Sequence, residues 1–98
     1  MGAIALAAAS LGAVAQALAA DMELGRYLAA ECMTCHRSAT ATSTIPNIFG
    51  LEEGHVSAVM QAYRSKSLPN PVMQNIAGRL SDEDIAALAL FFSRTKTP

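Results

Sequence analysis

The segment Cys32-Met33-Thr34-Cys35-His36 constrains this chain more than any other, because it contains both of the cysteines in the sequence. Two thiols separated by two residues are typical of a disulfide, of part of a metal site, or of the attachment point of a haem. Attachment of a haem is the one use that gives the following residue, His36, an obligatory role. The rest of the sequence has to decide among these uses.

The length of the chain indicates that a cofactor is needed. It has 98 residues, which is enough for one domain, and 5% of them are aromatic with no Trp. Without the apolar N-terminal segment, the remainder lies in the size range where a protein core is marginal. Such domains depend on several disulfides, a metal or a large cofactor, and two cysteines form at most one disulfide. We therefore expect a bound cofactor to supply apolar bulk.

The charge pattern excludes one class of partner. Seven basic and eight acidic residues give a net charge of −1, and no block of like charge is present. Proteins that bind nucleic acid present a basic patch or stripe, so a nucleic-acid partner is not expected.

The N-terminal segment is typical of an export signal. Residues 1–20 carry no charged side chain, and Ala17-Leu18-Ala19 is a small-x-small site for signal peptidase. We predict a signal peptide over residues 1–20, cleaved after Ala19 or Ala20, and one domain over residues 21–98. The basic start of such a signal is missing, and an uncleaved membrane anchor or an Ala-rich helix kept in the fold remain alternatives. Export would place the domain in an oxidising compartment, with no stable membrane insertion after cleavage.

Helical periodicity without any strand-period pattern predicts an all-α fold. A first helix is expected from Met22 to Cys32, capped by Asp21, and the Ser- and Thr-rich residues 37–50 are expected to form an irregular loop. The apolar positions at helical spacing in this first helix are Leu24, Tyr27, Leu28 and Cys32. The cysteine motif would then lie at the C-terminal end of a helix, whereas the thioredoxin-like dithiol opens a helix after a strand.

Three further helical segments are predicted. The second runs from about Glu53 to Lys66, with acidic residues at its start and basic residues at its end. One short helical turn over residues 72–77 follows the two prolines of "LPNP". The last has Ser81 as its N-cap and is the strongest helix in the sequence. The inward faces of the two longer helices are listed as Val56, Val59, Met60 and Tyr63, and as Ile85, Leu88, Phe91 and Phe92.

The motif C-x-x-C-H favours a covalently attached haem. Each thiol would add to one vinyl group, and the turn between them would set His36 beneath the iron. Three alternatives remain: a zinc site from Cys32, Cys35, His36 and His55, a redox-active dithiol, and a structural disulfide. Adjacent Cys35 and His36 fit poorly with the paired spacing of zinc ligands, the dithiol lacks its strand-helix setting, and a disulfide between such close cysteines would stabilise little.

A haem in this chain would need a second axial ligand if its sixth position is filled. The candidates are Met60, Met73 and His55. Met73 follows Pro69-Asn70-Pro71 on a stiffened segment that can approach a flat cofactor, whereas Met60 lies on the apolar face of a helix and is expected to fill the core. His55, next to two glutamates, is expected to lie at the surface.

The order of these motifs resembles that of the class I c-type cytochromes of bacteria. The matching residues are C-x-x-C-H, Ile45-Pro46-Asn47-Ile48, Met73 and the terminal "LSDEDIAALA.FF", so the resemblance covers residues 22–95. It is closest to the haem subunit of flavocytochrome c sulfide dehydrogenase and to single halves of periplasmic diheme cytochromes. It implies a small cytochrome c fold, with three main helices and a short one around one haem c.

The resemblance also implies the roles of individual residues. Cys32 and Cys35 would hold the haem covalently, His36 and Met73 would be the proximal and distal iron ligands, and the carbonyl of Pro46 would accept a hydrogen bond from the ring of His36. Gly25 and Leu28 would lie where the first helix crosses the last one. One departure is Arg37, which stands where the family usually has Gly; pairing with a haem propionate is one hypothesis for it.

By the same resemblance, the function would be periplasmic one-electron transfer. The chain would not be catalytic alone, because both axial positions of the iron are filled by protein. We expect it to be the haem subunit that accepts electrons from a flavoprotein sulfide dehydrogenase. The alternatives are a free periplasmic carrier to an oxidase or reductase and, in a different class, a haem protein that binds or senses a ligand.

Overall fold

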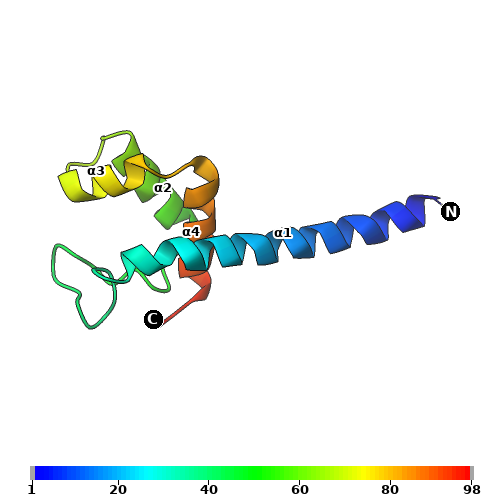
Figure 1. The fold of residues 1–98 in the computed structure, drawn as a ribbon, viewed down its shortest axis with the longest axis horizontal. Coiled ribbons are helices and arrows are strands. Elements are labelled where there is room, and N and C mark those ends of the chain that lie inside the picture. The colour runs from blue at the N-terminus through cyan, green and yellow to red at the C-terminus, as the bar shows by residue number, and fades with distance from the viewer. Residues whose placement is uncertain (1, 98) are drawn as a thin grey trace.

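The computed structural model describes residues 2–97, with side chains from Leu11 onward, and confirms the predicted all-α class. It contains four helices and, within these residues, no strand (Figure 1). The helices are α1 (Gly2–Cys32), α2 (Glu53–Arg64), α3 (Pro71–Gly78) and α4 (Asp82–Arg94). As predicted, residues 37–50 form an irregular loop and α3 is the short helix.

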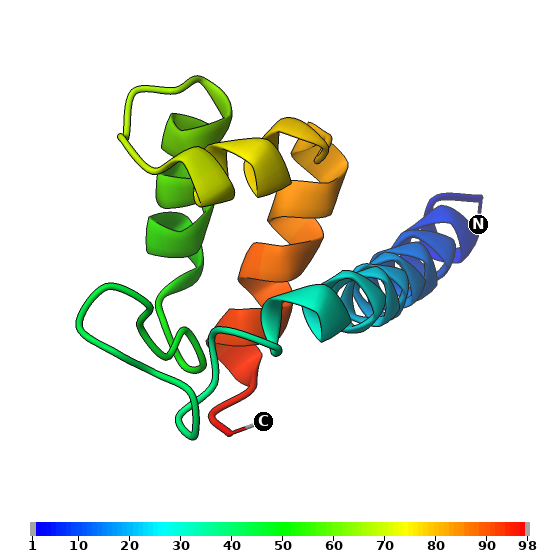
Figure 2. The same ribbon diagram turned by 60° about the vertical axis from the view of Figure 1, so that its left-hand side comes forward.

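The helices pack as a chain of neighbours rather than as a closed bundle. Helix α1 packs on α4, α4 packs on α2, and α2 packs on α3. Among the described residues, α1 and α3 do not pack against each other, and Figure 2 shows them on different sides of the domain. The two helices that flank the functional site are therefore held through their neighbours.

Helix α1 begins much earlier than predicted. It is continuous from Gly2 to Cys32, so Asp21 lies inside the helix and the prediction that it caps the start was wrong. The preceding residues are rich in Ala, which has the highest helix propensity, and no proline interrupts them. Residues 11–20 are exposed, and this part of α1 projects from the domain (Figure 1). No described helix has the length and hydropathy needed to cross a bilayer, and Met1 lies outside the described residues.

Helices α1 and α4 cross at Gly25, as the sequence predicted. A Cβ atom at this position would lie 2.3 Å from the carbonyl oxygen of Ala87 and 2.7 Å from Cβ of Phe91. Ala29, one turn further along α1, is fully buried. Tyr27, one of the apolar positions at helical spacing, is nevertheless 79% exposed. Two residues correspond to about 200° of rotation on a helix, so Tyr27 points away from a contact made by Gly25.

The core lies between α1, α4 and the loop. The four residues predicted to face inward from the last helix are all buried, and Leu28 packs partly buried against them. The rings of Phe49 and Phe92 meet edge to face, with centroids 5.0 Å apart, and the backbone N–H of Gly50 donates to the carbonyl of Phe92 over 2.8 Å. The loop is thereby fixed to the end of α4. The buried residues of α4 include Ile85, Leu88, Phe91 and Phe92.

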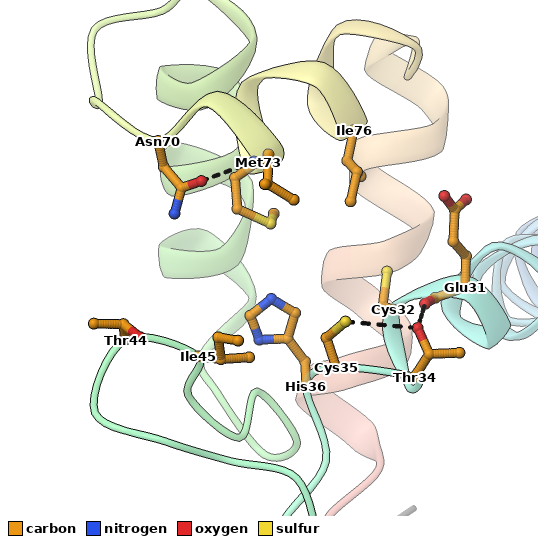
Figure 3. Close-up of a pocket in the computed structure, with 11 residues that line it drawn as sticks. Glu31, Cys32, Thr34, Cys35, His36, Thr44, Ile45, Asn70, Met73 and Ile76 are labelled. Atoms are coloured by element: carbon orange, nitrogen blue, oxygen red, sulfur yellow. Dashed lines mark hydrogen bonds between the residues drawn. The ribbon is translucent and has the colours of Figure 1, made fainter.

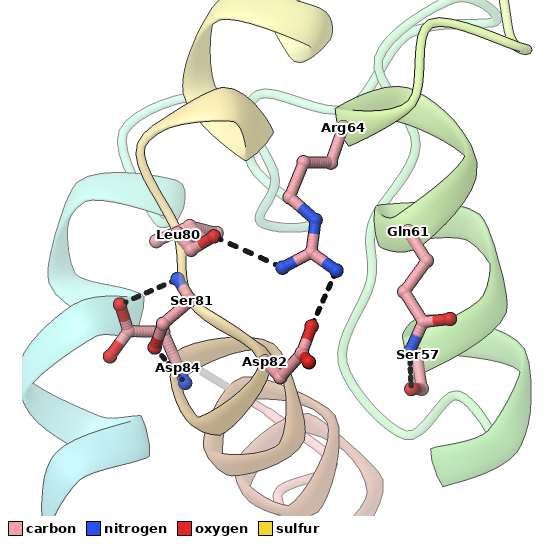
Figure 4. Close-up of polar contacts among 7 residues, drawn as sticks. All are labelled: Ser57, Gln61, Arg64, Leu80, Ser81, Asp82 and Asp84. Carbon is pink, nitrogen blue, oxygen red and sulfur yellow. Dashed lines mark hydrogen bonds and ion pairs between the residues drawn. The ribbon is translucent and has the colours of Figure 1, made fainter.

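Capping residues set the ends of the later helices. Ser81 and Asp84 form the reciprocal capping box of α4 (Figure 4), which confirms Ser81 as its N-cap. Helix α2 ends at Arg64, two residues earlier than predicted. The reason is the left-handed backbone of Lys66, with φ of 66°, which lets the N–H of Ser67 donate back to the carbonyl of Ala62.

Candidate haem-binding site

The cysteine motif lies at the C-terminal end of α1, as predicted. Cys32 is the last residue of the helix, and the backbone N–H groups of Cys35 and His36 both donate to its carbonyl, over 3.2 and 2.9 Å. This tight turn directs both thiols and the imidazole to the same side of the chain. Both cysteines are free thiols, and Figure 3 shows them beside His36 on one wall of a cavity.

His36 is oriented by the hydrogen bond that the resemblance to c-type cytochromes implied. Its Nδ1 lies 2.7 Å from the carbonyl oxygen of Pro46. Because a prolyl carbonyl can only accept, Nδ1 carries the proton and donates it. In the neutral ring, this bond selects the tautomer with its lone pair on the other nitrogen, Nε2, which is the form of imidazole that binds a metal.

Met73 faces His36 from the opposite wall. It lies in the first turn of α3, where the side chain of Asn70 caps the helix by accepting from the backbone N–H of Met73 over 3.1 Å. Pro71 begins the helix, a position where its missing N–H costs nothing. Figure 3 shows the thioether of Met73 and the ring of His36 directed toward each other across the cavity.

The cavity between them has a volume of about 350 Å³ and mostly apolar walls. A second cavity of about 150 Å³ adjoins it, since four of the lining residues are shared. The larger one is lined by Glu31, Cys32, Thr34, Cys35, His36, Thr44, Ile45, Asn70, Val72, Met73 and Ile76. The walls therefore come from the end of α1, the loop and α3, and among the described residues α1 and α3 do not pack against each other.

The electrostatics of the thiols argue against a redox-active dithiol. Burial, with a smaller contribution from the neighbouring carboxylate of Glu31, raises the pKa of the Cys32 thiol to about 11. Catalytic cysteines have lowered pKa values, because the thiolate is the nucleophile. At neutral pH the Cys32 thiol is protonated, so it lacks the property that this alternative needs.

The remaining ligand candidates lie away from the axis between His36 and Met73. His55 is exposed and Met60 is partly buried, and both line the second cavity from α2 together with Tyr63. Among the described residues, no three His, Cys, Asp or Glu side chains come close enough to hold a metal ion. The zinc site considered from the sequence is therefore not assembled in this part of the chain.

Arg37 occupies its place without backbone strain. Among the described non-glycine residues, Lys66 alone has a positive φ, so the turn after His36 does not require glycine. Its carbonyl accepts from the backbone N–H of Thr40 over 3.0 Å, and its side chain is exposed. This answers the question raised by the missing glycine, while the propionate hypothesis stays a prediction.

Sequence reasoning did not identify Glu31, Asn70, Val72 or Ile76 as part of the site. Asn70 carries a signal that could have been used, because Asn followed by Pro is typical of an N-cap and first helical residue. The others line the cavity because of how α1 and α3 are placed, for which the sequence offers no local pattern.

The residues of the cavity fit a covalently bound haem. Two thiols would be available for the two vinyl groups, an oriented imidazole and a thioether face each other and could both bind the iron, and apolar walls suit a flat macrocycle. In the described residues no buried polar side-chain atom is left without a hydrogen-bond partner. The arrangement defines a haem site of the c type.

Comparison with known proteins agrees with this class, although no protein-family model matches the chain. The chain is 33% identical over 92 residues to cytochrome c-553 of Helicobacter pylori, a match that covers 89% of this chain and 94% of the relative. It is 33% identical over 70 residues to the thiosulfate dehydrogenase electron acceptor of Stutzerimonas stutzeri, and 30% identical over 94 residues to that of Thiomonas intermedia. These matches cover 68% and 93% of the chain but 32% and 43% of the two relatives, so the chain spans less than half of their length.

The chain belongs to the small c-type cytochromes. Cytochromes of this family hold a haem through thioether bonds to cysteines, which agrees with the two thiols in this cavity.

Proposed function

We propose that this chain is a cytochrome with one haem that transfers single electrons, in which Cys32 and Cys35 form the thioether bonds and His36 and Met73 are the axial ligands. The observation that carries the proposal is the hydrogen bond from Nδ1 of His36 to Pro46, because it fixes the ring with Nε2 on the side that faces Met73. Two thiols are enough for one haem.

When bound, the haem supplies an iron that takes up and releases one electron. The residues of the chain set how readily this happens. The thioether of Met73 is a soft ligand that favours iron(II) and raises the reduction potential, while the bond to Pro46 fixes the ring of His36 and increases its basicity. Because protein groups fill both axial positions, no position is left for a substrate, and the chain alone is not catalytic.

The exposed residues at the rim of the larger cavity form the surface that we propose for contact with a redox partner. Val72 is 68% exposed and Ile45 is 36% exposed, and the polar residues Thr34 and Thr44 lie in the same walls. A permanent interface buries about 1,000 Å² or more on each partner and has an apolar centre, whereas transient partners meet over smaller and more polar areas. A rim with two exposed apolar side chains suits a transient partner better.

We therefore favour a carrier that accepts electrons from a dehydrogenase of reduced sulfur compounds. The names of the two thiosulfate dehydrogenase electron acceptors support this class of donor, and the resemblance to flavocytochrome c keeps a sulfide-oxidising flavoprotein as the alternative. Gel filtration followed by absorption spectroscopy separates the two, because a permanent flavoprotein subunit would bring a flavin band along with the haem.

Export to the periplasm is part of the proposal, with residues 1–20 as the signal peptide and residues 21–98 as the cytochrome domain. The side chains of residues 11–20 are all exposed, and the residues that pack against the core begin at Met22. Cleavage after Ala19 or Ala20 would therefore leave the core intact.

Replacing Met73 tests the ligand assignment. Met73→Ala should abolish the weak far-red absorption band of ferric haem with a methionine ligand, lower the reduction potential and open the ferrous iron to carbon monoxide. The matched control is Met60→Ala, which changes the other candidate methionine and should keep the band. An unchanged spectrum for Met73→Ala would remove Met73 as ligand, and rapid carbon monoxide binding by the unaltered protein would favour the ligand-binding class instead.

A further inference from the structure

Helix α3, which carries Met73, has few attachments to the rest of the domain. It packs on α2, and among the described residues neither α1 nor α4 packs against it. Its start is held by local bonds, since the cap of Asn70 and the bond from Gln74 Nε2 to the carbonyl of Leu68, 2.8 Å, both stay within this segment. The contacts at the C-terminal end of α3 therefore decide where Met73 lies relative to His36.

The far end of α3 is tied to α1 by one ion pair across the cavity. Arg79 follows the last residue of α3, and its Nη2 lies 2.8 Å from Oε1 of Glu31, a residue 48 positions earlier in the chain. Glu31 immediately precedes Cys32 and lines the larger cavity (Figure 3). In residues 11–97, no other hydrogen bond or ion pair joins α1 to α3.

The corner after α3 is also fastened to α2, on the opposite side. Arg64, the last residue of α2, donates from Nη1 to the carbonyl of Leu80 over 3.2 Å and from Nη2 to Oδ1 of Asp82 over 2.5 Å (Figure 4). Arg64 holds the corner in place, because it bonds a backbone carbonyl and a side-chain carboxylate of the corner. Arg64 does not bond to α1, so the link between the end of α3 and α1 is made by Arg79.

We propose that the Glu31–Arg79 ion pair is a latch that holds α3, and with it Met73, against the haem iron. Both residues are positioning residues: they act through Met73, and the inference rests on the proposed ligation by Met73. For Met73 to leave the iron, α3 has to move away from the wall that carries Cys32 and His36, and this movement separates Arg79 from Glu31. The latch therefore adds to the strength of the iron–thioether bond.

The exposure of the pair predicts how the latch behaves. The side chains of Arg79 and Glu31 are 59% and 60% exposed, so the pair contributes little to global stability and is screened by salt. Loss of an exposed ion pair corresponds to a change of about two- to five-fold in the equilibrium that it biases. The effect should be visible in methionine ligation while the unfolding midpoint hardly changes.

Titration of the ferric holoprotein with imidazole, which competes with Met73 for the iron, measures this equilibrium. Glu31→Gln and Arg79→Gln should each bind imidazole about two- to five-fold more tightly, as read from loss of the far-red band. The double variant should show no larger effect than either single one, because both remove the same contact. The exchanged pair, Glu31→Arg with Arg79→Glu, should restore weaker binding, and added salt should strengthen imidazole binding in the natural protein but not in Glu31→Gln.

Glu23→Gln is the matched control, because Glu23 pairs with Arg26 over 2.6 Å on the exposed side of the same helix. It should bind imidazole as the natural protein does. Equal imidazole affinity in Glu31→Gln, Arg79→Gln and Glu23→Gln would overturn the latch, and so would additive effects in the double variant. Failure of the ligand assignment itself gives a different result, since the natural protein would then lack the far-red band before any imidazole is added.

Discussion

Asn70 links the fold to the site through a single side chain. Its Oδ1 accepts from the backbone N–H of Met73 and so caps α3, and the same residue lines both cavities. Figure 3 shows its amide group directed toward the space between Met73 and Thr44. A cap that bonds to the ligand residue itself fixes the backbone from which the thioether projects. At this residue, helix stability and the position of Met73 cannot be separated.

Removing this cap should weaken both properties. Asn70→Ala is expected to lower the free energy of unfolding by about 1 kcal/mol, the usual cost of losing an N-cap, and to reduce the far-red band of the ferric protein. Chemical denaturation and absorption spectroscopy measure the two effects. Asn70→Ser, which keeps a capping oxygen, should recover most of the loss, and Asn75→Ala on the exposed face of α3 should have neither effect. A fully stable Asn70→Ala would contradict the role of the cap.

Helices α1 and α4 can approach closely because Gly25 has no side chain at their crossing. The helices approach most closely where Gly25 meets the backbone carbonyl of Ala87, and this contact fixes the angle at which the end of α1 enters the site. Because Cys32 ends α1, any shift at the crossing is carried along a stiff helix to the thiols. The last helix contributes no residue to the walls of the larger cavity, yet it sets the wall that carries the attachment motif.

A methyl group at the crossing should therefore be costly. Gly25→Ala is expected to destabilise the protein by about 1–3 kcal/mol, because the new Cβ would meet a backbone carbonyl that cannot rotate away. Thermal unfolding followed by circular dichroism measures this. Gly78→Ala at the end of α3 is the control, since nothing lies within 4 Å of its added Cβ, and it should leave stability the same or raise it slightly. Equal stability of the two variants would show that the crossing tolerates a wider separation.

The domain as a whole is completed by what its cavity binds. Its buried residues gather between α1, α4 and the loop, while α3 and the adjoining part of α2 face a cavity with apolar walls. A protein of this size has little stability to lose, and leaving those walls in contact with water removes part of its hydrophobic stabilisation. A covalently held haem would turn the cavity into the second half of the core.

Preventing haem attachment should therefore also reduce the stability of the fold. The double variant Cys32→Ala and Cys35→Ala is expected to lose haem staining after denaturing electrophoresis and to lose cooperative thermal unfolding in circular dichroism. Thr34→Ala is the control, because it changes an exposed residue of the same turn and keeps both thiols. A cooperative transition in the cysteine-free chain would mean that the four helices form an adequate core without the cofactor.

Much of the fold follows from local patterns in the sequence. The helical class, the capping box at Ser81 and the buried face of α4 were predicted because period and capping are properties of neighbouring residues. The start of α1 was predicted wrongly, and the apolar pattern did not indicate that Tyr27 is exposed. The first depended on how far an Ala-rich helix continues, and the second on which side of α1 meets α4, which no local pattern specifies.

The sequence by itself determined the chemistry of the site, because C-x-x-C-H places two thiols and an imidazole on one turn and the prolines around Asn70 isolate Met73 from the core helices. The tertiary structure alone decided how these groups meet. It directs Nδ1 of His36 to Pro46, sets Met73 on the facing wall, and brings Arg79 to Glu31 across the cavity. The physical reason is separation along the chain. The thiols and the imidazole come from neighbouring residues, whereas the distance between the two walls depends on α1 and α3, whose packing in the described residues is connected only through α4 and α2.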